Sequence, residues 1–186
     1  TPIPDNFSNS PIKLYNQGRL EETIQMAEEM VTRFTTSIML YNLIATANAG
    51  LKNLNQAIVN FQKVLEINPQ NAEAYYNIGN IHQQRKEFDA EIESYKKALS
   101  IKPEYPEVYN NMGVALKAKG DVTSAIEQFT SAINIKPDFA EALYNLGLIL
   151  QETGDLSNSI KRYKQAFEVR PSYFKAHFNM GNALKD

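Results

Sequence analysis

The chain has 186 residues, of which 43% are hydrophobic, and this is enough apolar material for a core or for an array of small units. Its formal net charge is -2 and it has no basic stripe, so we expect neither nucleic acid nor a membrane surface as a partner. Cysteine is absent, which excludes disulfides and thiolate metal sites, and no apolar run approaches the ~18 residues of a membrane helix.

The first part of the chain, residues 4–37, predicts a degenerate pair of helices. The second helix is clear in the stretch RLEETIQMAEEMVTRF, and the first is short, because Pro11 suits a helix start behind a Ser10 cap. The second helix also carries carboxylates at mixed spacings, which we expect to form a solvated face. These carboxylates belong to Glu21, Glu22, Glu28 and Glu29.

The rest of the chain repeats with a period of 34 residues. This interval separates Pro69, Pro103, Pro137 and Pro171, and it also separates Gly79, Gly113, Gly147 and Gly181. The period predicts full repeats at 38–71, 72–105, 106–139 and 140–173. Residues 174–186 then form the first helix of a further, truncated repeat, and the whole chain is one array.

Each repeat predicts two helices, most clearly in residues 106–139. A first apolar stripe ends near Gly120, Asp121 can cap a second helix, and Pro137 stops that helix. Such a pair cannot bury both of its apolar stripes alone, so it must stack on its neighbours. The pattern therefore predicts an all-α chain of about eleven helices.

The order aromatic, apolar, glycine, then alanine, aromatic, alanine and proline resembles the tetratricopeptide repeat (TPR). The resemblance implies a right-handed superhelical solenoid of antiparallel helix pairs without catalytic activity. The chain departs from this pattern at Glu91 and Ser159, which replace a small residue at position twenty, and at His82, which replaces a large residue at position eleven.

Few residues indicate reaction chemistry. His82 and His177 are far apart in sequence, and packed or partly buried histidines are the expected reading. No glycine-rich phosphate loop and no convergent set of metal ligands is present. We therefore expect no catalytic residues, no cofactor and no metal site.

Position six of the repeat holds an asparagine four times, at Asn77, Asn111, Asn145 and Asn179. Asparagine costs a helix roughly 0.5 kcal/mol relative to alanine, so four such choices indicate function or strain. Helical spacing places position six off the core stripe. In the tetratricopeptide family, as the resemblance implies, this face of the first helix lines the concave groove. Leu43 takes the position in the first full repeat.

An asparagine ladder could bind the backbone of an extended peptide, because the amide both donates and accepts. The ladder is similar to the one in the repeats of O-linked N-acetylglucosamine transferases. The other candidate groove residues are Asn80, Asn182, Tyr76, Tyr144, Glu73, Glu107 and Glu141. Alternatively, the asparagines bond to each other or to a neighbouring helix and only stiffen the array.

These observations predict a non-catalytic module that binds a protein or peptide segment. Glutamate at position two would repel a terminal carboxylate, so we expect a neutral or basic, internal segment. One alternative is the substrate-recruiting arm of a larger, glycosyltransferase-like enzyme. Another is a self-assembling scaffold, a homo-oligomer joined through its end repeats or through a tail with Pro2 and Pro4. The sequence does not determine the cellular compartment of the protein, although the cytoplasm is favoured.

Overall fold

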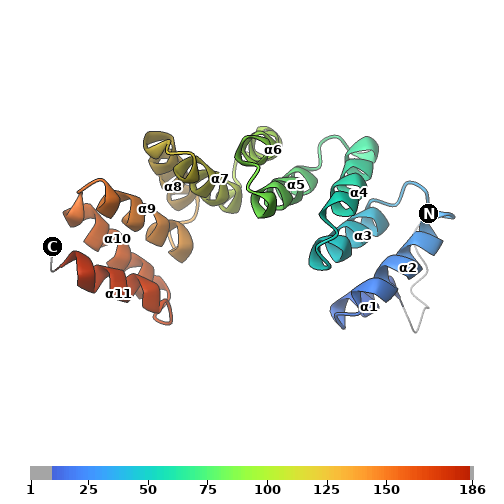
Figure 1. Ribbon diagram of the computed structural model, residues 1–186, viewed down its shortest axis with the longest axis horizontal. Coiled ribbons are helices and arrows are strands. Elements are labelled where there is room, and N and C mark those ends of the chain that lie inside the picture. The colour runs from blue at the N-terminus through green and yellow to red at the C-terminus, as the bar shows by residue number, and fades with distance from the viewer. Residues whose placement is uncertain (1–9, 185–186) are drawn as a thin grey trace. The chain divides into compact units, whose positions relative to one another are not determined.

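A computed structural model describes residues 10–184, and every regular element in this range is an α-helix (Figure 1). Eleven helices lie within these residues, which confirms the all-α prediction. The expected tail with Pro2 and Pro4 and the last two residues of the chain lie outside the described range. The chain divides into two compact units, residues 1–85 and residues 86–186.

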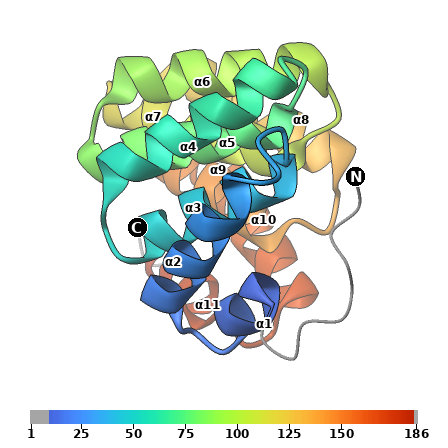
Figure 2. The ribbon, with the colours of Figure 1, turned by 90° about the vertical axis from the view of Figure 1, so that its right-hand side faces the viewer.

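The first unit contains α1 to α5 among its described residues (Figure 2). These helices are α1 Pro11–Asn16, α2 Leu20–Val31, α3 Ile38–Gly50, α4 Leu54–Ile67 and α5 Ala72–Arg85. The side chain of Ser10 accepts a hydrogen bond from the backbone N–H of Lys13 at 3.2 Å, and Pro11 follows it as the first helical residue. The predicted helix start is thus confirmed.

Two apolar clusters hold the first unit together. Ala27 on α2 packs with Leu40 and Ile44 on α3. A larger cluster joins α3, α4 and α5 through Ala45, Ala57, Phe61, Val64, Ala74, Ile78 and Ile81. The apolar residues recur at three and four spacings, so each helix buries one stripe against the next helix. The predicted carboxylates of α2 are all exposed, as expected of a solvated face.

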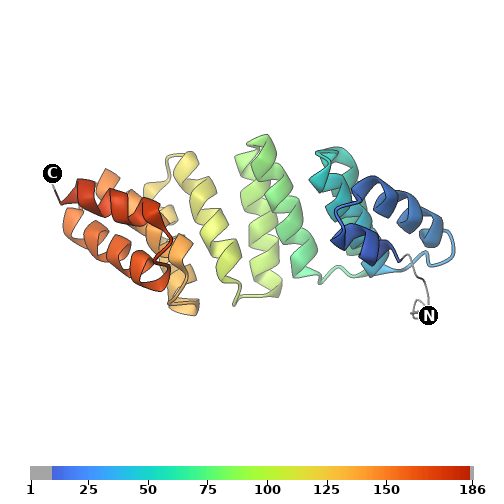
Figure 3. The same ribbon diagram turned by 90° about the horizontal axis from the view of Figure 1, so that it is seen from below.

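The second unit contains α6 to α11. These helices are α6 Phe88–Ile101, α7 Pro106–Ala118, α8 Val122–Ile135, α9 Ala140–Glu152, α10 Leu156–Val169 and α11 Phe174–Ala183. At its C-terminal end, α10 and α11 lie side by side (Figure 3), with Leu143, Ala166 and Ala176 in one buried cluster that also joins α9.

The turn between α7 and α8 follows the predicted chemistry. Gly120 adopts φ +84°, a left-handed conformation that ends a helix without the strain a side chain would bring. Asp121 then accepts the backbone N–H of Ser124 at 3.1 Å. A hydrogen bond with the Ser124 side chain and, to a smaller extent, the bond from the Ser124 backbone hold the pKa of Asp121 below its usual value. The cap thus favours the ionised carboxylate.

Glycine at position eight lets the two helices of a repeat approach closely. A Cβ atom on Gly113 would lie 2.7 Å from the ring of Phe129, and one on Gly147 would lie 2.7 Å from the ring of Tyr163. Gly181 on α11 has open space at the same place, because no second helix packs there among the described residues. Close packing therefore accounts for Gly113 and Gly147.

Glu91 and Ser159 replace the usual small residue at position twenty of the repeat, and both side chains are buried. The hydroxyl of Ser159 donates to the carbonyl oxygen of Gly147 at 2.8 Å and so links α10 to α9. Glu91 on α6 is likewise fully buried. A polar side chain at this place thus contributes to the contact between paired helices in the Ser159 copy.

Candidate functional site

The position-six asparagines lie on the first helices of the repeats. Asn77 is on α5 in the first unit, whereas Asn111, Asn145 and Asn179 are on α7, α9 and α11 in the second. All four side chains are partly exposed. A poor helix former therefore recurs at a place with access to solvent, where packing does not require it.

Direct hydrogen bonds join Asn145 and Asn179 to the preceding first helix. Nδ2 of Asn145 donates to Oδ1 of Asn110 at 2.9 Å, and Nδ2 of Asn179 donates to the hydroxyl of Tyr144 at 3.1 Å. Nδ2 of Asn110 in turn donates to Oδ1 of Asn111 at 3.2 Å. We call these five residues, at positions five and six, the amide row.

Within the amide row, asparagine side chains bond to neighbouring helices, which was the alternative predicted from the sequence. Asn145 and Asn179 each use an N–H group between helices. Among the described residues, no donor reaches Oδ1 of either side chain, and both remain partly exposed. The row therefore links α9 to α7 and α11 to α9 through one N–H group of each amide.

Tyr144, a predicted aromatic anchor, is held by other aromatic rings. Its ring centroid lies 5.0 Å from that of Tyr173 and 5.8 Å from that of Tyr163. Burial raises the pKa of Tyr163, whose hydroxyl donates to Oε1 of Gln151 at 2.8 Å. Tyr144 thus has a fixed position in which its hydroxyl oxygen can accept from Asn179.

Two of the predicted glutamates are paired with basic residues of the same repeat. Glu141 accepts from Nη1 and Nη2 of Arg170 at 2.6 and 3.3 Å, and Glu107 lies 3.9 Å from Nζ of Lys136. Burial alone would raise the pKa of Glu141, but the bonds from Arg170 and the charge of that residue bring it below its usual value. Because these charges are compensated, the reason for expecting a basic partner is weaker than the sequence suggested.

The basic partners also stack on aromatic rings in the corner between repeats. Nζ of Lys136 lies 5.1 Å from the Phe139 ring centroid, and the Arg170 guanidinium lies 5.6 Å from that of Tyr173. Sequence reasoning missed this corner, although KPEY, KPDF and RPSY recur with the period of the prolines. It also missed Asn110, whose neighbours in the repeat pattern at position five are tyrosines.

The remaining candidate residues lie on the last helix of each unit, α5 or α11. Glu73, Tyr76 and Asn80 share α5 with Asn77 at spacings of three and four residues, so they occupy one face of that helix. Asn182 lies on α11, three residues beyond Asn179, and is partly exposed. Their part in recognition stays a prediction.

The two histidines lie in different surroundings. His82 is partly buried on α5, whereas His177 is exposed on α11 with its ring centroid 5.0 Å from that of Phe167. His82 is thus partly buried as expected, and His177, although exposed, contacts the Phe167 ring of α10. Among residues 10–184 no group of three or more potential ligands could hold a metal ion, and no helix is long and apolar enough to cross a membrane.

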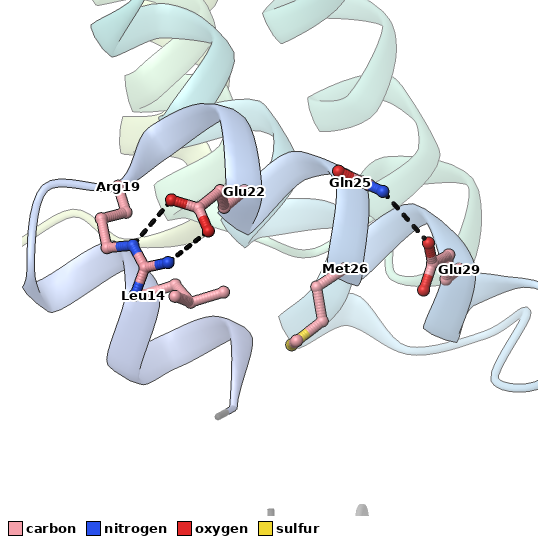
Figure 4. Close-up of a pocket in the computed structure, with 6 residues that line it drawn as sticks. All are labelled: Leu14, Arg19, Glu22, Gln25, Met26 and Glu29. Atoms are coloured by element: carbon pink, nitrogen blue, oxygen red, sulfur yellow. Dashed lines mark hydrogen bonds and ion pairs between the residues drawn. The ribbon is translucent and has the colours of Figure 1, made fainter. Parts of the chain in front are cut away.

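A shallow pocket of about 180 Å³ lies between α1 and α2, with Leu14 and Met26 in its lining (Figure 4). Its rim is acidic but partly compensated. Nε of Arg19 donates to Glu22 at 2.7 Å, and Nε2 of Gln25 approaches Glu29 at 3.5 Å. The Arg19 hydrogen bonds lower the pKa of Glu22. This arrangement is typical of a solvated helix surface.

Comparison with known families agrees with this geometry. A family model described as "TPR repeat" matches residues 51–86, 80–120, 115–154 and 149–186, which together span more than half of the chain. The chain belongs to the tetratricopeptide repeat family. Its paired helices, its glycine–aromatic contacts and its proline corners are those of a TPR protein. A comparison with curated protein sequences finds no match.

Several solved structures share this TPR fold. The crystal structure of MamA has a TM-score of 0.80 at 22% identity, over 91% of this chain and 99% of MamA. That of YrrB, titled a TPR protein with an unusual peptide-binding site, has a TM-score of 0.73 at 16% identity, over 91% of this chain and 87% of YrrB. TTC0263, a thermophilic TPR protein from Thermus thermophilus, gives 0.71 at 16% identity, over 95% of this chain and 96% of TTC0263. At these identities the likeness concerns the fold.

Proposed function

We propose that this chain is a non-catalytic interaction module that binds an extended segment of another protein along the amide row. The observation that carries the proposal is the placement of partly exposed amides on three consecutive first helices of the second unit. Side chains with access to solvent that recur once per repeat suit a partner that runs across the repeats. The peptide-binding site named for YrrB supports a peptide as the ligand.

The corresponding experiment uses the full chain and a synthetic library of random twelve-residue peptides. The tightest peptide is then titrated against a double variant, Asn145→Ala with Asn179→Ala, and we expect binding to weaken at least about tenfold. Asn134→Ala is the control, because Asn134 is exposed on α8, away from the first helices. Equal binding by the double variant and the control would refute a binding site on the amide row.

Exposed apolar side chains on α11 and directly after it favour a second candidate, self-assembly. Phe174, Phe178 and Leu184 are 75%, 68% and 64% exposed, more than the other large apolar side chains of the described residues. A contact between copies could bury them. Light scattering over a concentration series tests this, and a monomer at every concentration would remove the candidate. A recruiting arm of a larger enzyme would use the same peptide binding, and the full-length gene sequence decides that question.

A further inference from the structure

In the part of the chain that the structure describes, one face of α11 has no helix packed on it. Phe174, Phe178, Gly181 and Leu184 follow one another at spacings of four, three and three residues, so they share this face. The two rings and the leucine are exposed, whereas Ala176 on the opposite face is fully buried in the cluster that joins α11 to α9 and α10. The helix is thus covered on one side and bare and apolar on the other.

Gly181 corresponds to two glycines that each receive an aromatic ring from a neighbouring helix. A Cβ atom on Gly113 would lie 2.7 Å from the ring of Phe129, and one on Gly147 would lie 2.7 Å from the ring of Tyr163. A Cβ atom on Gly181 would meet no atom of another helix within 4 Å. The two covered repeats therefore show what kind of group packs at this place, which is a ring on a helix.

The bare face carries both halves of such a contact, a glycine and an exposed ring. Phe178 lies three residues before Gly181. If two copies pair their α11 helices antiparallel, the ring of each can lie on the glycine of the other, and Phe174 of each comes near Leu184 of the other. A contact about a two-fold axis requires a self-complementary surface of this kind. Parallel helices would instead set ring against ring.

We propose that α11 pairs with α11 of a second copy of this chain, antiparallel about a two-fold axis, with each Phe178 ring packed on Gly181 of the other copy. The inference deepens the self-assembly candidate of the proposed function and rests on it. No residue of the shared face is an aspartate, glutamate, lysine or arginine, so the axis brings no permanent like charges together.

The exposed area on this face suits a weak, reversible dimer. Phe174 and Phe178 are 75% and 68% exposed, and an aromatic side chain presents about 150–250 Å² in all, so the two rings expose roughly 300 Å² per copy. A pair would remove about 600 Å² of ring surface from water, to which Leu184 adds, whereas stable specific interfaces bury ~1,200 Å² or more. We therefore expect dimers only at micromolar concentrations or above.

Sedimentation velocity of the full chain between about 1 µM and 1 mM tests the pairing. We expect a rise from monomer to dimer and no larger species, because a two-fold contact closes. A monomer at every concentration would overturn the inference together with the self-assembly candidate, while binding of a peptide along the amide row would stand. Growth beyond the dimer would indicate a head-to-tail contact and overturn the inference alone.

Gly181→Ala distinguishes this contact from unspecific association of apolar surface. The added methyl group has open space in the monomer but would meet the ring of the other copy. We expect Gly181→Ala and Phe178→Ala each to weaken the dimer at least about tenfold. The control is Val59→Ala on α4, which shortens a side chain that is 47% exposed in the first unit and should leave the dimer unchanged. Melting curves check that all variants are folded.

The double variant tests whether the ring lies on the glycine. Once Phe178 is alanine, the further change of Gly181 to alanine should weaken the dimer by less than about twofold, because the ring that the methyl group would meet is gone. Two full and additive losses would show that the residues act separately and would overturn the pairing. A dimer that neither single substitution weakens would likewise overturn it and assign self-assembly to another surface.

Discussion

Replacing Asn145 by alanine measures how far the amide row holds neighbouring helices together. The substitution removes the Nδ2 donor that lies 2.9 Å from Oδ1 of Asn110. Asn110 is only 8% exposed, so water has little access to that oxygen once the donor is gone. A buried polar group without its partner costs ~1–3 kcal/mol, and the better helix propensity of alanine offsets roughly 0.5 kcal/mol.

We therefore expect Asn145→Ala to lower the free energy of unfolding by about 0.5–2.5 kcal/mol. For a chain of this size the loss corresponds to a fall in Tm of roughly 1–10 °C. Urea unfolding followed by far-UV circular dichroism gives the free energies. A double-mutant cycle with Asn110→Ala should show a coupling energy of about 0.5–1.5 kcal/mol, because the two side chains share one hydrogen bond.

The matched control is Asn134→Ala on α8, where the exposed side chain makes no hydrogen bond among the described residues. This change should be neutral or slightly stabilising through helix propensity. If Asn145→Ala is as stable as the control and its coupling to Asn110 is near zero, the bond between helices does not form in solution. The amides would then serve a ligand alone, and the reasoning on the row would be refuted.

Four further substitutions test the packing and the caps. Gly113→Ala places a methyl group 2.7 Å from a buried ring of α8, so an overpacking cost of ~1–3 kcal/mol should exceed the gain of ~1 kcal/mol in helix propensity. Gly181→Ala has open space and should only gain; a lower urea midpoint for Gly181→Ala than for Gly113→Ala would contradict this. Ser159→Ala removes a buried hydroxyl that donates to a carbonyl of α9 and should cost ~1 kcal/mol in the same assay, whereas an unchanged midpoint would make that bond unimportant. Asp121 has a lowered pKa from its bonds to Ser124, so its contribution is full above the usual pKa and is lost as the pH falls through the lowered value. Asp121→Asn should reduce the change in the urea midpoint between about pH 5 and pH 2. If the pH dependence of the midpoint is the same in the variant, the cap does not titrate in that range.

The helices could be predicted from the sequence because their ends are marked by local signals. Pro137 cannot continue the helix that precedes it, and Gly120 and Asp121 end one helix and cap the next through bonds that span only a few residues. The 34-residue period multiplies each signal, so an ambiguous copy can be read from a clear one. These features depend on the chain near each residue and on little else.

The partners within the site could be predicted only in part. The exposed asparagine series was visible from the helical period, but the bond between Asn145 and Asn110 joins residues 35 apart in different repeats. Its formation depends on how two helices are placed side by side and on the rotamers of both side chains. The pairing of Glu141 with Arg170 has the same character, since it closes over a corner whose geometry no single helix pattern contains.

Position five, rather than position six, decides how far the amide row can extend. Asn145 and Asn179 donate to acceptors at position five of the preceding repeat, where Asn110 and Tyr144 each offer an oxygen. Phe178 occupies the same position on α11 and offers none. An asparagine on any helix packed beyond α11 would keep its N–H group for another partner. The hydrogen bonds of Asn145 and Asn179 thus depend on the residue at position five of the preceding repeat as much as on the asparagine itself.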